Sequence, residues 1–159
     1  MKESLRVSTS KTNEQIADIE KELRYIAGII KHKGREILNN YPITTPQFIA
    51  LQFLLEHGDM TLGELSKKIN HAFSTTTDLV DRMEKNEIVK RVKDTKDRRV
   101  VRIHLLEKGK KIIHEVVEKR QDYLGEVLIN VNDEEIGQLS KLLHLLHNEM
   151  KYEKEKGKV

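Results

Sequence analysis

Basic residues gather in one short segment of the chain and could bind a polyanion. They are Lys90, Arg91, Lys93, Lys96, Arg98, Arg99 and Arg102. Asp94 and Asp97 lie among them, so the segment has seven positive charges against two negative ones, an excess of five. The net charge of all 159 residues is only +3, so the remainder of the chain is net negative. Such a localised excess favours a nucleic-acid contact, although a solvated turn would also carry charge.

Short polar side chains precede this segment, in the run AFSTTTDLVDRMEKN. Hydroxyl groups at the start of a helix can reach phosphates or base edges without blocking a DNA groove, and a carboxylate can accept from a cytosine amino group. The candidate DNA contacts are Ser74, Thr75, Thr77, Asp78 and Arg82. Two alternatives remain: a hydroxyl between Ser74 and Thr77 only caps the helix, or Arg82 pairs with Asp78 four positions before it.

Helix-capping residues indicate the elements that hold these side chains. Thr45, as N-cap before Pro46, predicts the start of a helix that ends at Gly58. Thr61 and the glutamate three residues later form a capping box, which predicts a short second helix. After a polar joint, the run with the hydroxyl side chains forms the next helix. Residues 61–86 therefore have the outline of a helix-turn-helix motif.

Alternating apolar and polar residues follow this motif. The pattern predicts two strands, Ile88 to Lys93 and Arg99 to Leu105, joined as a β-hairpin by the turn DTKD. A helix-turn-helix motif followed directly by a hairpin is a winged helix. Residues 88–105 are therefore the expected wing.

The charged turn of this wing supplies three further candidate DNA contacts, Lys96, Arg98 and Arg99. Arg98 lies at the turn, where the negative potential of a narrow, A·T-rich minor groove would attract it. Asp97 is expected to brace the loop through an ion pair with Arg99, which could also meet a phosphate.

Long amphipathic helices are predicted at both ends of the chain. The first, from Asn13 to about Asn39, has an apolar stripe with a period of three to four residues, made by Ile16, Ile19, Leu23, Ile26 and Ile30. The same period marks residues 109–128 and the segment after Asn132, an expected N-cap. These helices have more apolar surface than one small core would bury, which predicts a homodimer interface; a monomeric helical bundle is the alternative.

The run TTTDLVDRMEKNEIVKRVKDTKDRRVVRIHLLEKG resembles the recognition helix, wing and following helix start of the MarR family of bacterial transcription regulators. The order of elements agrees from about Asn13 to Met150. The resemblance implies a mainly α fold with a small β-hairpin wing (α+β), in a single domain over residues 12–152. Within it, dimerisation helices over residues 13–40 and 108–152 would flank a winged-helix lobe over residues 43–106.

The resemblance also implies a function. Members of the family are dimers, and the second helix of each helix-turn-helix motif would enter the major groove of a pseudo-palindromic site in double-stranded DNA. A repressor of this kind would leave DNA when a small-molecule effector binds. The candidate residues of an effector pocket are Tyr25, Tyr41, Phe48 and His57. The family usually has glycine where this chain has Glu87, so we expect the left-handed residue after the recognition helix at Asn86.

The sequence argues against several other classes of protein. It has no cysteine, which excludes disulfides and thiolate metal sites, and no phosphate-binding loop, HExxH motif or nucleophile elbow, so we expect neither an enzyme nor a cofactor. His144 and His147, with His114, are a minor candidate for a metal site. No apolar run suits a signal peptide or a membrane span, which predicts a cytoplasmic protein without a membrane partner. A winged-helix module that binds an acidic protein instead of DNA is the alternative function.

Overall fold

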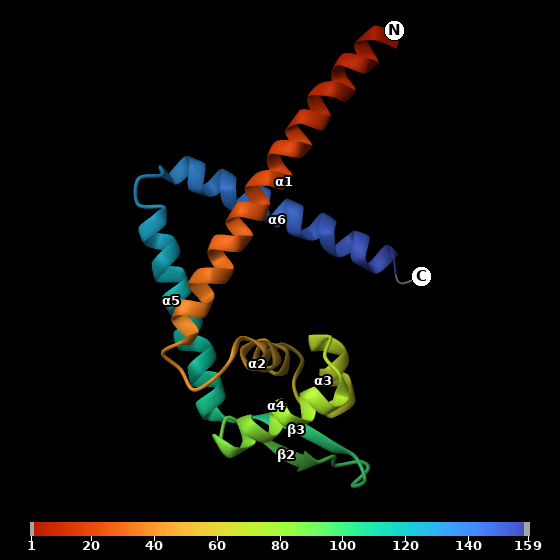
Figure 1. Ribbon diagram of the computed structural model, residues 1–159, viewed down its shortest axis with the longest axis vertical. Helices are drawn as coiled ribbons and strands as arrows, with labels where there is room; N and C mark the ends of the chain where they lie inside the picture. The colour runs from red at the N-terminus through yellow and green to blue at the C-terminus, as the bar shows by residue number, and fades with distance from the viewer. Residues whose placement is uncertain (1, 158–159) are drawn as a thin grey trace. The chain divides into compact units, whose positions relative to one another are not determined.

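This computed structural model describes the backbone of residues 2–157 and the side chains of residues 12–157. The described residues form six helices and three short strands, with connecting loops (Figure 1). In chain order they are α1 (Lys2–Leu38), α2 (Thr45–His57), β1 (Met60–Thr61), α3 (Leu62–Ile69), α4 (Phe73–Lys85), β2 (Val89–Lys93), β3 (Val101–Leu105), α5 (Glu107–Val127) and α6 (Asp133–Lys156). The chain divides into two units, of which the first ends at Arg120 and the second begins at Gln121. The mainly helical fold with a small sheet is the predicted fold class.

The helix-turn-helix motif and the wing are both present, in a winged lobe that runs from α2 to β3. Its antiparallel sheet has the order β1-β3-β2, with Arg91 opposite Ile103 in the hairpin and Met60 opposite Ile103 on the other side. The hairpin was predicted, but the third strand was not. β1 has only two residues, which is too short for a period of two to be recognised in the sequence.

One apolar core holds the winged lobe together with the end of α1 and the first half of α5. Its largest fully buried side chains include Phe48, Leu51, Leu65, Met83, Ile103 and Val116. They come from α2, α3, α4, β3 and α5, so the recognition helix and the wing share a single packed support. The inner face of α4, made by Leu79, Val80 and Met83, is buried in this core.

Side-chain caps fix where the first two helices of this lobe begin. Thr61 accepts a hydrogen bond from the backbone N–H of Glu64, whose carboxylate accepts one from the Thr61 N–H, so the predicted capping box is confirmed. The N-cap of α2 is Thr44 rather than the predicted Thr45. Thr44 forms a second capping box with Gln47, a residue that can return the bond, and this reciprocal pair decides the start of the helix.

The recognition helix α4 ends in a Schellman motif whose left-handed residue is Glu87, not the predicted Asn86. The backbone N–H of Ile88 donates to the Met83 carbonyl, and that of Glu87 to the Glu84 carbonyl. This pair of bonds requires a positive φ at the first residue past the cap, where Glu87 has φ 60° and Asn86 has φ −85°. The structure thus places a bulky residue in a conformation that favours glycine.

We expect Glu87→Gly to raise the free energy of unfolding by about 1 kcal/mol, because glycine adopts a positive φ without the clash between Cβ and the backbone. Urea unfolding followed by circular dichroism measures this difference. Asn86→Gly is the matched control: Asn86 has an ordinary negative φ, so glycine there brings no relief and should lower stability slightly. Equal or lower stability of Glu87→Gly would contradict the assignment.

A glycine lets α5 begin directly against the wing. A Cβ atom at Gly109 would lie 2.6 Å from Cδ1 of Leu105 and 2.7 Å from the carbonyl oxygen of Ile88. No other residue fits without moving the backbone before β2. The base of the hairpin and the start of α5 therefore pack as one piece.

The apolar stripe of α1 is exposed in the single chain. α1 begins at Lys2, earlier than the predicted Asn13, because the first residues contain no proline or glycine that would end the helix. Along it, Ile16, Ile19, Ile26 and Ile30 are 47–58% exposed. α6, capped by Asn132 as predicted, also has large exposed apolar side chains, among them Leu142, Leu143 and Leu145. None of the described helices is both long and apolar enough to cross a membrane.

Candidate nucleic-acid interface

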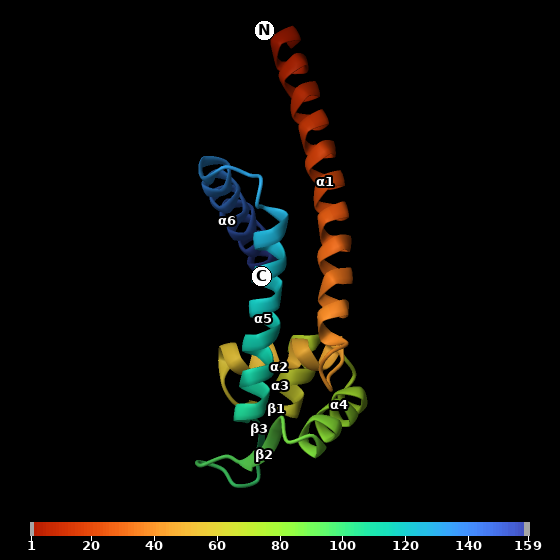
Figure 2. The same cartoon turned by 90° about the vertical axis from the view of Figure 1, so that its left-hand side faces the viewer.

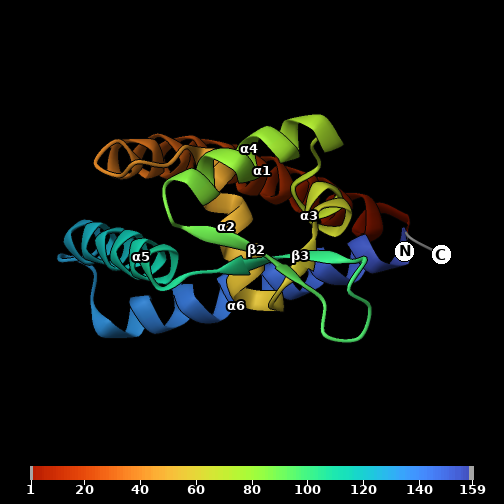
Figure 3. The same ribbon diagram turned by 90° about the horizontal axis from the view of Figure 1, so that it is seen from below.

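α4 and the β2–β3 hairpin lie next to each other on one face of the winged lobe (Figure 3). Both are at the lower end of the views in Figures 1 and 2. The outward face of α4 is lined by Ser74, Asp78, Asp81 and Lys85, which are all exposed and follow one another at steps of three and four residues. A helix and a hairpin presented together are the two parts of a winged helix that can enter DNA grooves.

The hydroxyl side chains at the start of α4 do not cap it. The N-cap is Ala72, and no side chain there accepts a hydrogen bond from the first turn. Thr76 and Thr77 instead donate to the carbonyl oxygens of Ala72 and Phe73, at 3.0 and 2.9 Å. The capping alternative is therefore wrong. Thr76 is fully buried, whereas the hydroxyls of Ser74 and Thr75 are exposed and have no hydrogen-bond partner among the described residues.

Asp78 and Arg82 do not form the ion pair that their spacing allows, as judged over residues 12–157. Both are exposed, and they line a shallow depression between α4 and the start of α2, together with Thr44 and Gln47. With neither charge neutralised, Arg82 is available to a phosphate and Asp78 to a hydrogen-bond donor.

Arg91 on β2 ties the wing to the recognition helix. Its guanidinium donates to Asp81 at 2.6 Å and to Glu84 at 2.8 Å, and its backbone N–H donates to Glu84 at 2.7 Å. Burial alone would lower the pKa of Arg91, but the hydrogen bonds to Asp81 and Glu84 raise it above its ordinary value. The pairing takes up three charges and holds α4 and β2 in one geometry.

Asp94 organises the turn of the wing. Its carboxylate accepts from Arg102 Nε at 2.7 Å and from the backbone N–H groups of Asp97 and Lys96 at 3.0 and 3.1 Å. These bonds, the one from Arg102 first, lower the pKa of Asp94. Arg102 also lies 3.5 Å from the carboxylate of Glu64, so the turn is connected to α3 as well.

Asp97 and Arg99 form a local pair at the end of the turn. Nε and Nη2 of Arg99 donate to the Asp97 carboxylate at 3.1 and 3.2 Å, and the Arg99 backbone N–H donates to it at 3.1 Å. The side-chain bond and then the backbone bond lower the pKa of Asp97. The arginine remains 91% exposed, so its outer face is open to a phosphate.

Pairing changes the charge that was counted along the sequence. Three of the seven basic residues have carboxylate partners, namely Arg91, Arg99 and Arg102. Three of these partners, Glu64, Asp81 and Glu84, belong to α3 and α4 and were not counted in the segment. Subtracting their three negative charges lowers the excess of positive charge around the wing from five to two. Within the described part of the chain the unpaired basic residues of the wing are Lys90, Lys93, Lys96 and Arg98. Arg98 combines this freedom with exposure at the turn.

Sequence reasoning missed two residues on the outward face of α4, Asp81 and Lys85. Helical periodicity would have found them, because Asp81 lies seven positions after Ser74 and Lys85 lies four after Asp81. Periodicity could not have shown that Asp81 accepts a hydrogen bond from Arg91, since that contact depends on the fold of the hairpin.

The four candidate residues of an effector pocket have different surroundings. Phe48 is buried in the core, with the guanidinium of Arg120 at 4.9 Å from its ring. Tyr41 packs against the edge of the core, Tyr25 is 51% exposed on α1, and His57 stacks on Phe53 at the end of α2. Phe48 is thus part of the apolar core and Tyr41 packs against it.

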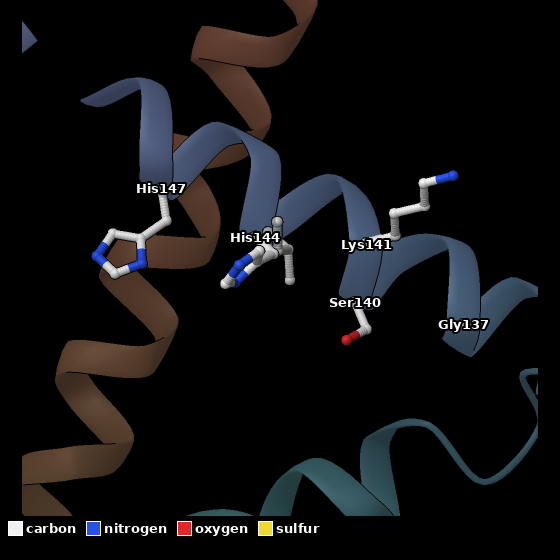
Figure 4. Close-up of a pocket in the computed structure, with 6 residues that line it drawn as sticks. Gly137, Ser140, Lys141, His144 and His147 are labelled. Carbon is white, nitrogen blue, oxygen red and sulfur yellow. The ribbon is translucent and has the colours of Figure 1, made fainter. Parts of the chain in front are cut away.

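His144 and His147 project from the same side of α6 as Ser140, where they line a shallow depression (Figure 4). All the residues that line it belong to α6. In residues 12–157 there is no group of three or more histidine, aspartate or glutamate side chains that could hold a metal ion. These two histidines therefore have no third ligand within the chain that the structure describes.

Comparisons with known proteins agree on one family. The model of the MarR family matches residues 43–101. The chain is 63% identical over 143 residues to YsmB, an uncharacterised helix-turn-helix-type transcriptional regulator of Bacillus subtilis, covering 90% of this chain and 98% of that protein. It is 26% identical over 127 residues to the transcriptional repressor MdtR of the same bacterium, covering 80% and 82%. A solved MarR family protein from Bacillus stearothermophilus is 59% identical, with a TM-score of 0.81, and the match covers 87% of this chain and 97% of that one.

Proposed function

Since this chain belongs to the MarR family and is a helix-turn-helix transcription regulator, we propose that it is a homodimeric repressor that binds a pseudo-palindromic site in double-stranded DNA. The observation that carries the proposal is that α4 and the wing share one face of the winged lobe (Figure 3). Both carry exposed hydroxyl or basic side chains that have no partner among the described residues. Its relative MdtR is named a repressor, which supports the direction of regulation. Such a protein would act in the cytoplasm, where bacterial DNA lies.

In this proposal α4 enters the major groove. Ser74 and Thr75 have exposed hydroxyls without partners in residues 12–157, and Thr77 can still accept a bond after donating to the backbone. These groups, with Asp78 and Arg82, would contact base edges and the flanking phosphates. Helix periodicity supports their joint action, because all of them lie near the outward face of one helix.

The wing contributes the second set of contacts. Arg98 would enter the adjacent minor groove, while Lys96 and the exposed face of Arg99 meet phosphates. Asp97 would hold Arg99 in place through the observed ion pair. The domain that does this is proposed to extend over residues 12–152.

The dimer is proposed from the exposed apolar stripe of α1. A single chain leaves Ile16, Ile19, Ile26 and Ile30 about half exposed, and a contiguous apolar stripe of this kind normally packs against another helix. A second copy supplies a matching stripe through two-fold symmetry. Two α4 helices would then be held at the spacing of two half-sites.

Release by a small-molecule effector is a further part of the proposal. A ligand that fits one spacing of the two α4 helices better than another would shift the population between DNA-binding and non-binding forms. The packing of Tyr41 and Phe48 beside Lys119 and Arg120 supports a site near these aromatic rings, because the cations could pair with an acidic compound. Tyr25 and His57 remain further candidate residues for effector contact.

Enrichment of bacterial genomic DNA on the purified protein tests the proposed function. Sequencing of the bound fragments should return one motif with two inverted half-sites. Its affinity should fall steeply with salt, by about three orders of magnitude between 50 and 200 mM if roughly six phosphates are contacted. No enriched motif, or an affinity independent of salt, would contradict DNA binding and favour an acidic protein partner.

A further inference from the structure

The first residue of the recognition helix is an exposed phenylalanine. Phe73 is 60% exposed, whereas Phe48 is 1% exposed and Phe53 packs against the core. Burying a phenylalanine side chain stabilises a fold by roughly 1.5–3 kcal/mol, and Phe73 contributes little of this in the free protein. The exposed ring of Phe73 is therefore available to contact a partner molecule.

Phe73 belongs to a small apolar patch between α4 and the wing, which we call the Phe73 patch. Its other members are Leu62 at the start of α3 and Val101 at the start of β3, which is 43% exposed. Arg91 and Arg99 line the same depression. The patch is thus apolar at its centre and basic at its edge.

Charge and polarity select the occupant of this patch. Its edge carries the guanidinium of Arg99, which is open to solvent, and the hydroxyls of Ser74 and Thr75 follow Phe73 directly. A partner must therefore combine negative charge and hydrogen-bonding groups with a small apolar group. Duplex DNA offers this combination in its major groove, where the only apolar group on the base edges is the 5-methyl group of thymine.

We propose that Phe73 is a specificity-determining residue, whose ring contacts the 5-methyl group of a thymine in each half-site. This inference rests on the proposed function and adds to it a particular base. Phenylalanine has no hydrogen-bonding group, so it cannot read any other feature of a base edge. The neighbouring hydroxyls would read polar groups, and the ring would favour a half-site with thymine over one with cytosine in its place.

Deoxyuridine tests this contact, because it pairs like thymidine and lacks only the methyl group. The operator is first selected from a random DNA pool with the wild-type protein. Each thymine of the half-site is then replaced in turn, in both half-sites together, and the Kd is measured by fluorescence anisotropy at one stated salt concentration. For one position we expect about fourfold weaker binding per half-site, hence about fifteenfold in all, which corresponds to roughly 0.8 kcal/mol for each methyl group.

The same pair of DNA duplexes is measured with variants. Phe73→Ala should bind the thymine and deoxyuridine duplexes equally, because without the ring the methyl group has no partner whose contact its removal could break. Phe73→Leu, which keeps an apolar side chain, should retain a preference for thymine. Ser74→Ala is the matched control next to it and should weaken binding to both duplexes by the same factor. Thermal unfolding of Phe73→Ala should resemble that of the wild type, since the side chain is mostly exposed.

Two results would overturn the inference. One is a wild-type protein that binds every deoxyuridine duplex as tightly as the parent operator, and the other is a Phe73→Ala variant that keeps the full preference for thymine. In both cases the operator is still bound, so the proposed function stands. Failure of the proposed function is a separate outcome, in which the wild-type protein selects no DNA from the pool.

Discussion

Replacing Arg98 by alanine is expected to weaken operator binding by about tenfold per wing and so about a hundredfold per dimer, at low salt. Arg98 is exposed at the turn of the wing and has no carboxylate partner among the described residues, so its charge is free for DNA. In a narrow minor groove the negative potential is concentrated, which makes one arginine there worth more than a phosphate contact on the surface. The measurement is a Kd at one stated salt concentration, repeated at several concentrations for the slope.

Two matched variants separate the roles of charge and shape at this position. Arg98→Lys keeps the positive charge and should lose less affinity than Arg98→Ala. Lys93→Ala removes a free charge from the strand before the turn and should cost less than Arg98→Ala. The midpoint of thermal unfolding should be unchanged in all three, because these side chains make no ion pair with any residue that the structure describes. Equal affinities of Arg98→Ala and wild type would remove Arg98 from the mechanism.

The second large effect is expected at the exposed stripe of α1. Ile26 and Ile30 lie one turn apart and are 47% and 49% exposed. The double substitution Ile26→Glu and Ile30→Glu would place four carboxylates in the interface of a symmetric dimer without partners. An unpaired buried charge costs several kcal/mol, so we expect the dimer to dissociate at micromolar concentration. Sedimentation should show the wild type at twice 18.6 kDa and the variant at 18.6 kDa.

Ala17→Glu is the control for this experiment. Ala17 is exposed on α1 but lies about opposite the stripe, so the added charge stays in water and the dimer should persist. The double variant should also lose operator binding while its winged lobe stays folded, which circular dichroism would report. A wild-type protein that sediments only as a monomer, or a double variant that stays dimeric, would contradict the proposed interface.

Local rules predicted most of the elements of this fold. The Thr61 capping box, the helix stop at Gly58 and the alternation in the hairpin depend on residues close in sequence, so each can be recognised without the fold. β1 was missed because two residues have no period. The left-handed residue was misplaced at Asn86, because the identity of the side chain suggested it, whereas the hydrogen bonds of the Schellman motif decide the position.

The candidate site was harder to predict than the fold, for a physical reason. Counting charges along the chain treats Arg91 and Arg98 alike, although Arg91 is bound by Asp81 and Glu84 and Arg98 has no partner in the described part of the chain. These partners lie ten and seven positions before Arg91, beyond the spacings at which residues on one helix meet. Tertiary pairing therefore decides which basic residues remain available, and only a structure reveals it.

The bonds from Arg91 to Asp81 and Glu84 have a consequence for how a target sequence would be chosen. They fix the distance between the helix proposed for the major groove and the turn proposed for the minor groove, so the protein has little freedom to adjust that distance. The duplex must then change its groove width to fit, and sequences that deform easily are bound at lower cost. Base pairs that no side chain touches would in this way also be selected, through the stiffness of the DNA.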